Sequence, residues 1–228
     1  MKTYLSCTFA GVALWASAAH AGGGMEGFGV PSNMDFYAGG SVGTASQDGA
    51  CNTLSGSTGC TDSGTGYKVF AGAQLKPNAP DGTLPKLGVE GGYIKFGESS
   101  SAGELLSVRG IPIGSSSAKS DLTGIYAAGT VSMPVAPRVE ILGKAGVMHW
   151  SQENKSTAVI DDDPEDERNQ STSSSESGFG GLLGAGAQYK INDNFSVRGE
   201  YERGFGVGKG ASKTEPSLLS VGAVFSTL

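Results

Sequence analysis

Hydrophobic and polar residues alternate along residues 138–152, which read RVEILGKAGVMHWSQ. One set of alternate positions is apolar up to its last member, and the other carries three charges, on Arg138, Glu140 and Lys144. A period of two indicates a β-strand with two different faces. At about 13 residues the strand is about 43 Å long, and a tilt of about 40° lets it cross an apolar band of about 25 Å. The pattern predicts a membrane strand with lipid on one side and a polar barrel interior on the other.

Seven further segments have the same two-faced alternation: 36–44, 67–75, 86–96, 121–133, 179–190, 195–205 and 217–227. Long polar connections at 46–64, 98–117 and 154–176, and a shorter one at 207–215, alternate with short turns. Aromatic residues collect near the predicted strand ends, as in interfacial girdles. This layout predicts an all-β fold, an eight-stranded antiparallel up-and-down transmembrane β-barrel, with long loops outside the cell and both termini in the periplasm.

The N-terminal segment has the pattern of an export signal. Lys2 precedes an apolar stretch, and Ala19-His20-Ala21 is an A-x-A cleavage site, so residues 1–21 are expected to be a signal peptide. Residues 22–35 form a glycine-rich lead, and residues 36–228 form the barrel. No apolar run of 18 residues follows the signal, which argues against a transmembrane helix.

Composition limits the partners. Glycine accounts for 38 of the 228 residues, and the net charge is −6. A negative chain without concentrated Lys and Arg is not expected to bind nucleic acid. Two cysteines and one histidine in the mature chain are too few for a structural zinc site, so no metal and no cofactor are expected.

Among the charged residues on the inward faces of the predicted strands, five are the candidates for a polar network: Glu90, Glu140, Lys144, Arg198 and Glu200. A lysine or arginine on the lipid side near the midplane would cost about 2–4 kcal/mol, so these side chains must point into the barrel. They form either a polar conduit or part of a side-chain-filled interior. The filled interior is the norm for eight strands.

Two features of the predicted loops have separate interpretations. Cys51 and Cys60 form an even pair in an exported chain, so a disulfide is expected, worth roughly 2–3 kcal/mol. The acidic run at 161–167 has no EF-hand spacing, which favours a solvated surface loop over a calcium site.

His149-Trp150-Ser151 is the one candidate for catalysis. The motif resembles the His-x-Ser pair that barrel-type lipid A deacylases have on the outer surface near the extracellular rim. Gln152 stands where that family has asparagine, and the wider motif is missing. A rim histidine is the better interpretation, and no enzymatic activity is expected.

Four segments together resemble the transmembrane domain of outer membrane protein A and its relatives: TGYKVFAG at 65–72, LGVEGGY at 87–93, SVRGEY at 196–201 and LSVG at 219–222. The resemblance covers nearly all of the mature chain. It implies an eight-stranded barrel in the outer membrane of a Gram-negative bacterium. It also implies a buried network of inward charges, matched by Glu90, Lys144, Arg198 and Glu200.

This sequence departs from that family in three places. Thr130 and Gln188 stand where the best-known member has a lysine–glutamate pair associated with gating, so gating by that pair is not expected here. The sequence ends after the predicted eighth strand, so the peptidoglycan-binding domain of longer members is not expected here. The C-terminal assembly signal is met by Gly222 and Phe225 but lacks the final aromatic residue.

The sequence therefore predicts a non-enzymatic outer-membrane protein with a structural or surface-interaction role through its extracellular loops. The expected partners are outer-membrane lipid, lipopolysaccharide and the outer-membrane assembly machinery, and the protein is expected to be a monomer. A small diffusion pore is the alternative function, and lipid A deacylation is a less favoured one.

Overall fold

The computed structural model describes residues 34–48, 59–75, 84–106, 112–160, 170–208 and 214–227, and these form nine β-strands. The strands are β1 (Met34–Asp48), β2 (Gly59–Thr61), β3 (Ser63–Leu75), β4 (Lys86–Leu106), β5 (Pro112–Ala136), β6 (Val139–Ile160), β7 (Gln170–Lys190), β8 (Phe195–Phe205) and β9 (Glu215–Ser226). No helix within these residues is long and apolar enough to cross a membrane.

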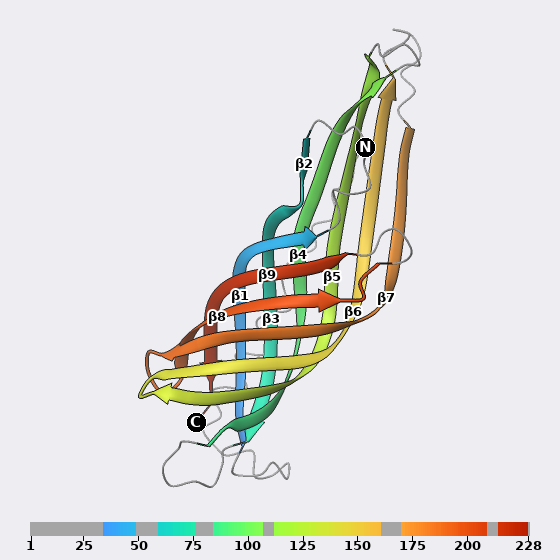
Figure 1. Ribbon diagram of the computed structural model, residues 1–228. Coiled ribbons are helices and arrows are strands. Elements are labelled where there is room, and N and C mark those ends of the chain that lie inside the picture. Colours follow the sequence, from blue (N-terminus) through green and yellow to red (C-terminus); the bar gives the residue numbers. More distant parts are fainter. Residues whose placement is uncertain are drawn as a thin grey trace, which may run out of the picture.

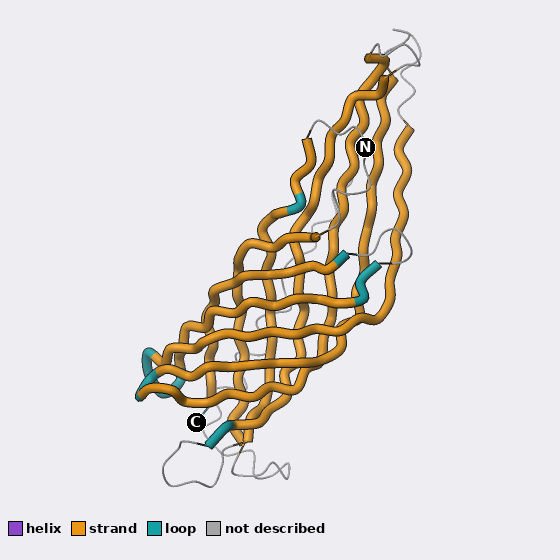
Figure 2. Tube along the Cα trace, in the orientation of Figure 1, coloured by secondary structure: helices purple, strands orange, loops and turns teal. Residues whose placement is uncertain are grey.

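Eight of the strands form a closed antiparallel ring in which each strand pairs with its neighbours in the chain (Figures 1 and 2). The ring closes between the first and last strands, where Tyr37 lies opposite Ser226. The predicted fold class, an eight-stranded up-and-down barrel, is confirmed. The short turns at 137–138 and 191–194 lie at the same end as Met34 and Ser226.

The strands on one side of the barrel are much longer than the others. β4, β5, β6 and β7 have 21, 25, 22 and 21 residues, whereas β8 and β9 have 11 and 12. The four long strands continue beyond the ring, at the end opposite the short turns, as a protruding sheet (Figure 1). We define this protruding sheet as residues 98–106, 112–121, 152–160 and 170–178, with β2 paired to β4 at one border.

The prediction of loops at 98–117 and 154–176 was wrong over most of their length, because 98–106, 112–117, 154–160 and 170–176 are strand. The short strand β2 within the predicted 46–64 loop was also missed. The reason is physical: the protruding sheet has polar side chains on both faces, so its strands lack the hydrophobic alternation that reveals a half-buried strand. Gly97, with φ of 75°, lies at an irregularity in the β4–β5 register where the protrusion begins.

Within the ring, the two faces of each strand differ in burial. Along β8, buried Ser196, Arg198, Glu200 and Glu202 alternate with more exposed residues. Large apolar side chains cover the outside: Val42, Val69, Val89, Ile125, Val147, Phe179, Leu183, Tyr201 and Leu219. Such a surface is stable only against an apolar solvent, as lipid is.

Candidate functional site

The barrel interior contains a cluster of six charged side chains from four strands. We define this ionic cluster as Lys68 on β3, Glu90 on β4, Lys144 on β6, and Arg198, Glu200 and Glu202 on β8. The period of two in each strand turns all six side chains inward. None is more than 9% exposed.

Each cation of the ionic cluster contacts at least two carboxylates. Lys144 Nζ lies 3.0 Å from Glu90 Oε1 and 3.1 Å from Glu200 Oε1, and it also contacts Glu202. Lys68 pairs with Glu200 and lies 3.0 Å from Glu202 Oε2. Arg198 Nη1 lies 2.8 Å from Glu90 Oε2. Three cations thus face three carboxylates, and the ionic cluster is neutral as a whole.

Aromatic side chains and one amide complete the surroundings of the ionic cluster. The hydroxyl groups of Tyr37 and Tyr126 donate hydrogen bonds to the two oxygens of Glu90, at 3.1 and 2.8 Å. Arg198 Nε donates to Gln188 Oε1 at 2.9 Å, and its guanidinium lies 4.9 Å from the ring centre of Phe70. Buried charges are tolerated when paired and hydrogen-bonded in this way.

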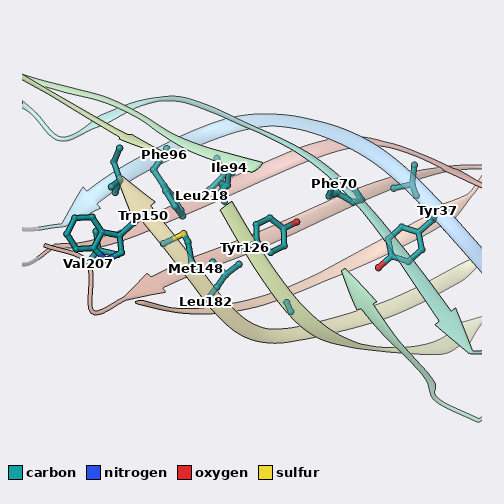
Figure 3. Packing of buried hydrophobic residues seen from close by; sticks show 14 residues of the cluster. Tyr37, Phe70, Ile94, Phe96, Tyr126, Met148, Trp150, Leu182, Val207 and Leu218 are labelled. Carbon is teal, nitrogen blue, oxygen red and sulfur yellow. The ribbon is translucent and has the colours of Figure 1, made fainter. Parts of the chain in front are cut away.

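An apolar layer fills the interior between the ionic cluster and the protruding sheet. We define it as Ile94, Phe96, Leu122, Met148, Trp150, Leu182, Val207 and Leu218, each of which is at most 1% exposed. Figure 3 shows the labelled members of this layer grouped together, with Tyr126 between them and the pair Phe70 and Tyr37. Apolar side chains thus fill the part of the interior that this layer occupies.

Glu140, which the sequence grouped with the other inward charges, lies in a separate ion-pair group. Its Oε1 accepts hydrogen bonds from Lys86 Nζ at 2.8 Å and Lys190 Nζ at 2.6 Å, near the end with the short turns. Between this group and Arg198 lies a cavity of about 20 Å³, which is room for roughly one water molecule. The structure therefore brings together Glu90, Lys144, Arg198 and Glu200 but not Glu140.

Four members of the site were not singled out from the sequence: Lys68, Glu202, Tyr37 and Tyr126. All four occupy positions of inward parity in the predicted strands, and this is the signal that could have identified them. The contacts between them are beyond sequence reasoning, because they depend on the relative stagger of strands that are distant in the chain.

His149 lies on the outer surface, directly across from Phe179. Its ring packs edge-on against Phe179 with 4.9 Å between ring centres. Ser151 is also exposed. In the part of the chain that the structure describes, no hydrogen bond joins His149 to Ser151.

A ladder of ion pairs marks where the protruding sheet leaves the apolar belt: half-buried Lys95 with Asp121, and the exposed pairs Lys119 with Glu98 and Lys155 with Glu153. The hydrogen bond from Lys119 lowers the pKa of Glu98 below its ordinary value. The two exposed pairs contribute little to stability.

Several predicted features lie outside the described residues: the signal peptide, most of the lead, Cys51 and the acidic run at 161–167. Cys60 is in β2, but its side chain is outside the described part, so the disulfide stays a prediction. Gly222 and Phe225 lie on β9, with Phe225 exposed on the outer surface. Their role as an assembly signal also stays a prediction.

Comparison with known proteins gives one family. The family model described as the OmpA-like transmembrane domain matches residues 31–227. No curated protein sequence matches the chain. Among solved structures, the attachment invasion locus protein Ail of Yersinia pestis is similar, with 13% identity, coverage of 86% of this chain and 99% of that chain, and a TM-score of 0.45. Neisserial surface protein A (14%, 85% and 97%, TM-score 0.42) and OprG of Pseudomonas aeruginosa (12%, 86% and 96%, TM-score 0.41) are also similar.

Proposed function

The chain belongs to the OmpA-like transmembrane domain family and is an outer-membrane β-barrel, and we propose that it is a closed, non-enzymatic barrel whose protruding sheet acts in interactions at the cell surface. In this proposal the protruding sheet is extracellular, and the short turns and both termini are periplasmic. A small diffusion pore is the competing function.

The observation that carries the proposal is the filled interior. Ions cross a barrel only along a continuous polar or water-filled path. Here the ionic cluster holds its own charges in mutual contact, and the apolar layer next to it is at most 1% exposed throughout. The small cavity beside Arg198 ends at the ionic cluster. The interior therefore supports a role as a scaffold and not as a conduit.

The protruding sheet is the part of the molecule suited to interaction. It extends strands β4 to β7 beyond the apolar belt, and its exposed side chains are mainly serine, threonine and charged residues. In outer-membrane barrels the longer connections face the outside of the cell. Outer-membrane lipid and lipopolysaccharide are the proposed partners of the apolar belt, and the assembly machinery the proposed partner of the β9 signal.

Conductance in planar bilayers tests the proposal against the pore. The purified full-length barrel is expected to give no steady openings, because buried apolar side chains fill the interior at the apolar layer. Steady openings whose size or ion selectivity changes in Glu90→Gln would contradict the closed barrel and support the pore.

Lipid A deacylation is tested separately. The purified barrel, incubated with lipopolysaccharide, is expected to release no fatty acid. Release that disappears in Ser151→Ala, while His149 still packs against Phe179, would establish an enzyme instead.

A further inference from the structure

One border of the protruding sheet has no partner strand among the residues that the structure describes. β7 pairs with β8 only up to Gly181, which lies opposite Phe205. Beyond that point, residues 171–178 of β7 are paired with β6 on one side, and none of the described residues pairs with the other side. We call residues 171–178 the free edge. The opposite border is different, because β2 pairs with β4 at residues 100–102.

The free edge lacks the features that usually protect an unpaired strand. Such edges commonly carry proline, lysine or a bulge. The free edge reads STSSSESG, with no proline, no lysine and one charge, on Glu176. Its register with β6 runs without a shift, and residues 171–175 are exposed. Its chemistry, a row of backbone donors and acceptors with small side chains, recognises another extended backbone.

Symmetry decides how two copies of this edge can pair. A two-fold axis along the strand would place identical groups opposite each other, N–H against N–H and C=O against C=O, and no ladder would form. A two-fold axis normal to the sheet makes the strands antiparallel and brings N–H opposite C=O. That axis also reverses the barrel direction, because the sheet continues the barrel wall and its normal is perpendicular to the barrel axis.

We propose that the free edge binds the free edge of a second copy held in a facing membrane, so that the protein joins two outer membranes. The proposal rests on the extracellular position of the protruding sheet given under the proposed function. The sequence of the edge is compatible with itself: in a register centred on Ser174, Glu176 lies opposite Thr172 of the other copy, and no like charges meet. The small serine side chains, on both faces of the sheet, allow the two edge strands to approach each other closely.

A single pairing of this kind is weak, because each backbone hydrogen bond replaces one with water and association has its own entropic cost. Many copies between two membranes act together, and their avidity exceeds the affinity of one pair. Adhesion between membranes is therefore the expected readout, and a dimer in detergent is not.

Vesicle association tests the proposal. The full-length protein is reconstituted into two vesicle populations with different fluorescent labels, and their association is counted by two-colour coincidence. Wild-type vesicles are expected to associate with each other and not with protein-free vesicles. The double variant Ser173→Lys, Ser175→Lys is expected to reduce association by about tenfold or more when both populations carry it, because like charges then face each other across many pairs.

Variants of opposite charge test whether the partner of the free edge is a second copy of this protein. Vesicles carrying Ser173→Lys, Ser175→Lys are mixed with vesicles carrying Ser173→Glu, Ser175→Glu. Association is expected to return in this mixture, while neither variant associates with itself. The matched control is Ser115→Lys, Ser117→Lys on the same face of β5, which is paired on both sides and should leave association unchanged.

The outcomes separate this inference from the proposed function. Association that the exchanged charges fail to restore, or equal association with protein-free vesicles, overturns pairing between copies. An epitope tag inserted at residue 165 is expected to be accessible to antibody on intact cells. An inaccessible tag overturns the orientation in the proposed function, whereas an accessible tag without vesicle association overturns only the pairing.

Discussion

Two neighbouring layers fill the barrel interior, and different forces hold them. In the ionic cluster every side chain depends on a partner of opposite charge, because an unpaired charge in a dry interior costs several kcal/mol. In the apolar layer, each side chain contributes buried apolar surface and packing contacts. When one side chain is shortened, its neighbours can shift to fill part of the space. The ionic cluster therefore requires each of its side chains to have its charged partner. The apolar layer requires only that its side chains fill the space.

The largest effect is expected when the ionic cluster loses Glu90. In Glu90→Gln the carboxylate that faces Lys144 and Arg198 is gone, and a net positive charge remains buried. Unfolding of the barrel in lipid vesicles, followed in urea, is expected to show a loss of about 3–5 kcal/mol.

Glu140→Gln is the control for this prediction. Its partner Lys190 has a side chain that is 39% exposed and can be hydrated when its carboxylate is lost. The loss should be clearly smaller than for Glu90→Gln. Equal losses at the two positions would contradict the view that the ionic cluster depends on pairing in a dry interior.

A smaller effect is expected in the apolar layer. Met148 is fully buried, and Met148→Ala leaves a cavity there without exposing a charge. The expected loss is about 2–3 kcal/mol in the same unfolding measurement, near the low end for such substitutions because the neighbouring side chains can relax. A loss above that of Glu90→Gln would reverse the proposed difference between the layers.

The smallest effects are expected when a glycine beside each layer is replaced by alanine. A methyl group added at Gly184 would come within 2.8 Å of Lys144 Cε, whereas at Gly124 it would meet the thioether of Met148 at 2.6 Å. Lys144 is held by three carboxylates and cannot move freely, but a methionine side chain can. Gly184→Ala is expected to cost about 1–3 kcal/mol and Gly124→Ala about 1 kcal/mol or less.

Gly143→Ala is the matched control on the outer face. Its nearest contact would be Val131 Cγ1 at 3.6 Å, an ordinary distance. The unfolding free energy should therefore stay the same or rise slightly. A loss as large as that of Gly184→Ala would show that the cost arises from the strand backbone and not from the packed interior.

The amino-acid sequence was sufficient to predict the eight-stranded ring. It was not sufficient to predict the apolar layer that fills the ring or the protruding sheet that extends it. The alternation around Lys144 and Arg198 identified which faces point inward, since a charge facing lipid is costly. Leu182 and Leu218 point inward as well, but their outward neighbours Leu183 and Leu219 are also apolar, so no alternation distinguished the apolar layer. In the protruding sheet both faces are polar, so the pattern of its serine-rich strands predicts loops and not strands.

The partners within the ionic cluster were also beyond prediction. Lys68 and Glu200 are 132 residues apart in the chain, and their contact depends on the closure of the whole ring. Glu140 has the same parity as Lys144 on the same strand, yet its four-residue separation places it in a different group. Parity assigns a side chain to a face of the wall, but the height along the barrel axis follows from strand tilt and stagger.

The composition of the ionic cluster has a consequence for how the barrel assembles. Its charges come from β3, β4, β6 and β8, and β8, near the end of the chain, supplies three of the six. Before β8 arrives, Lys68, Glu90 and Lys144 carry an uncompensated positive charge, which the hydrocarbon of a bilayer does not accommodate. A partial barrel is therefore unstable in the membrane, and insertion and ring closure are expected to be a single cooperative event.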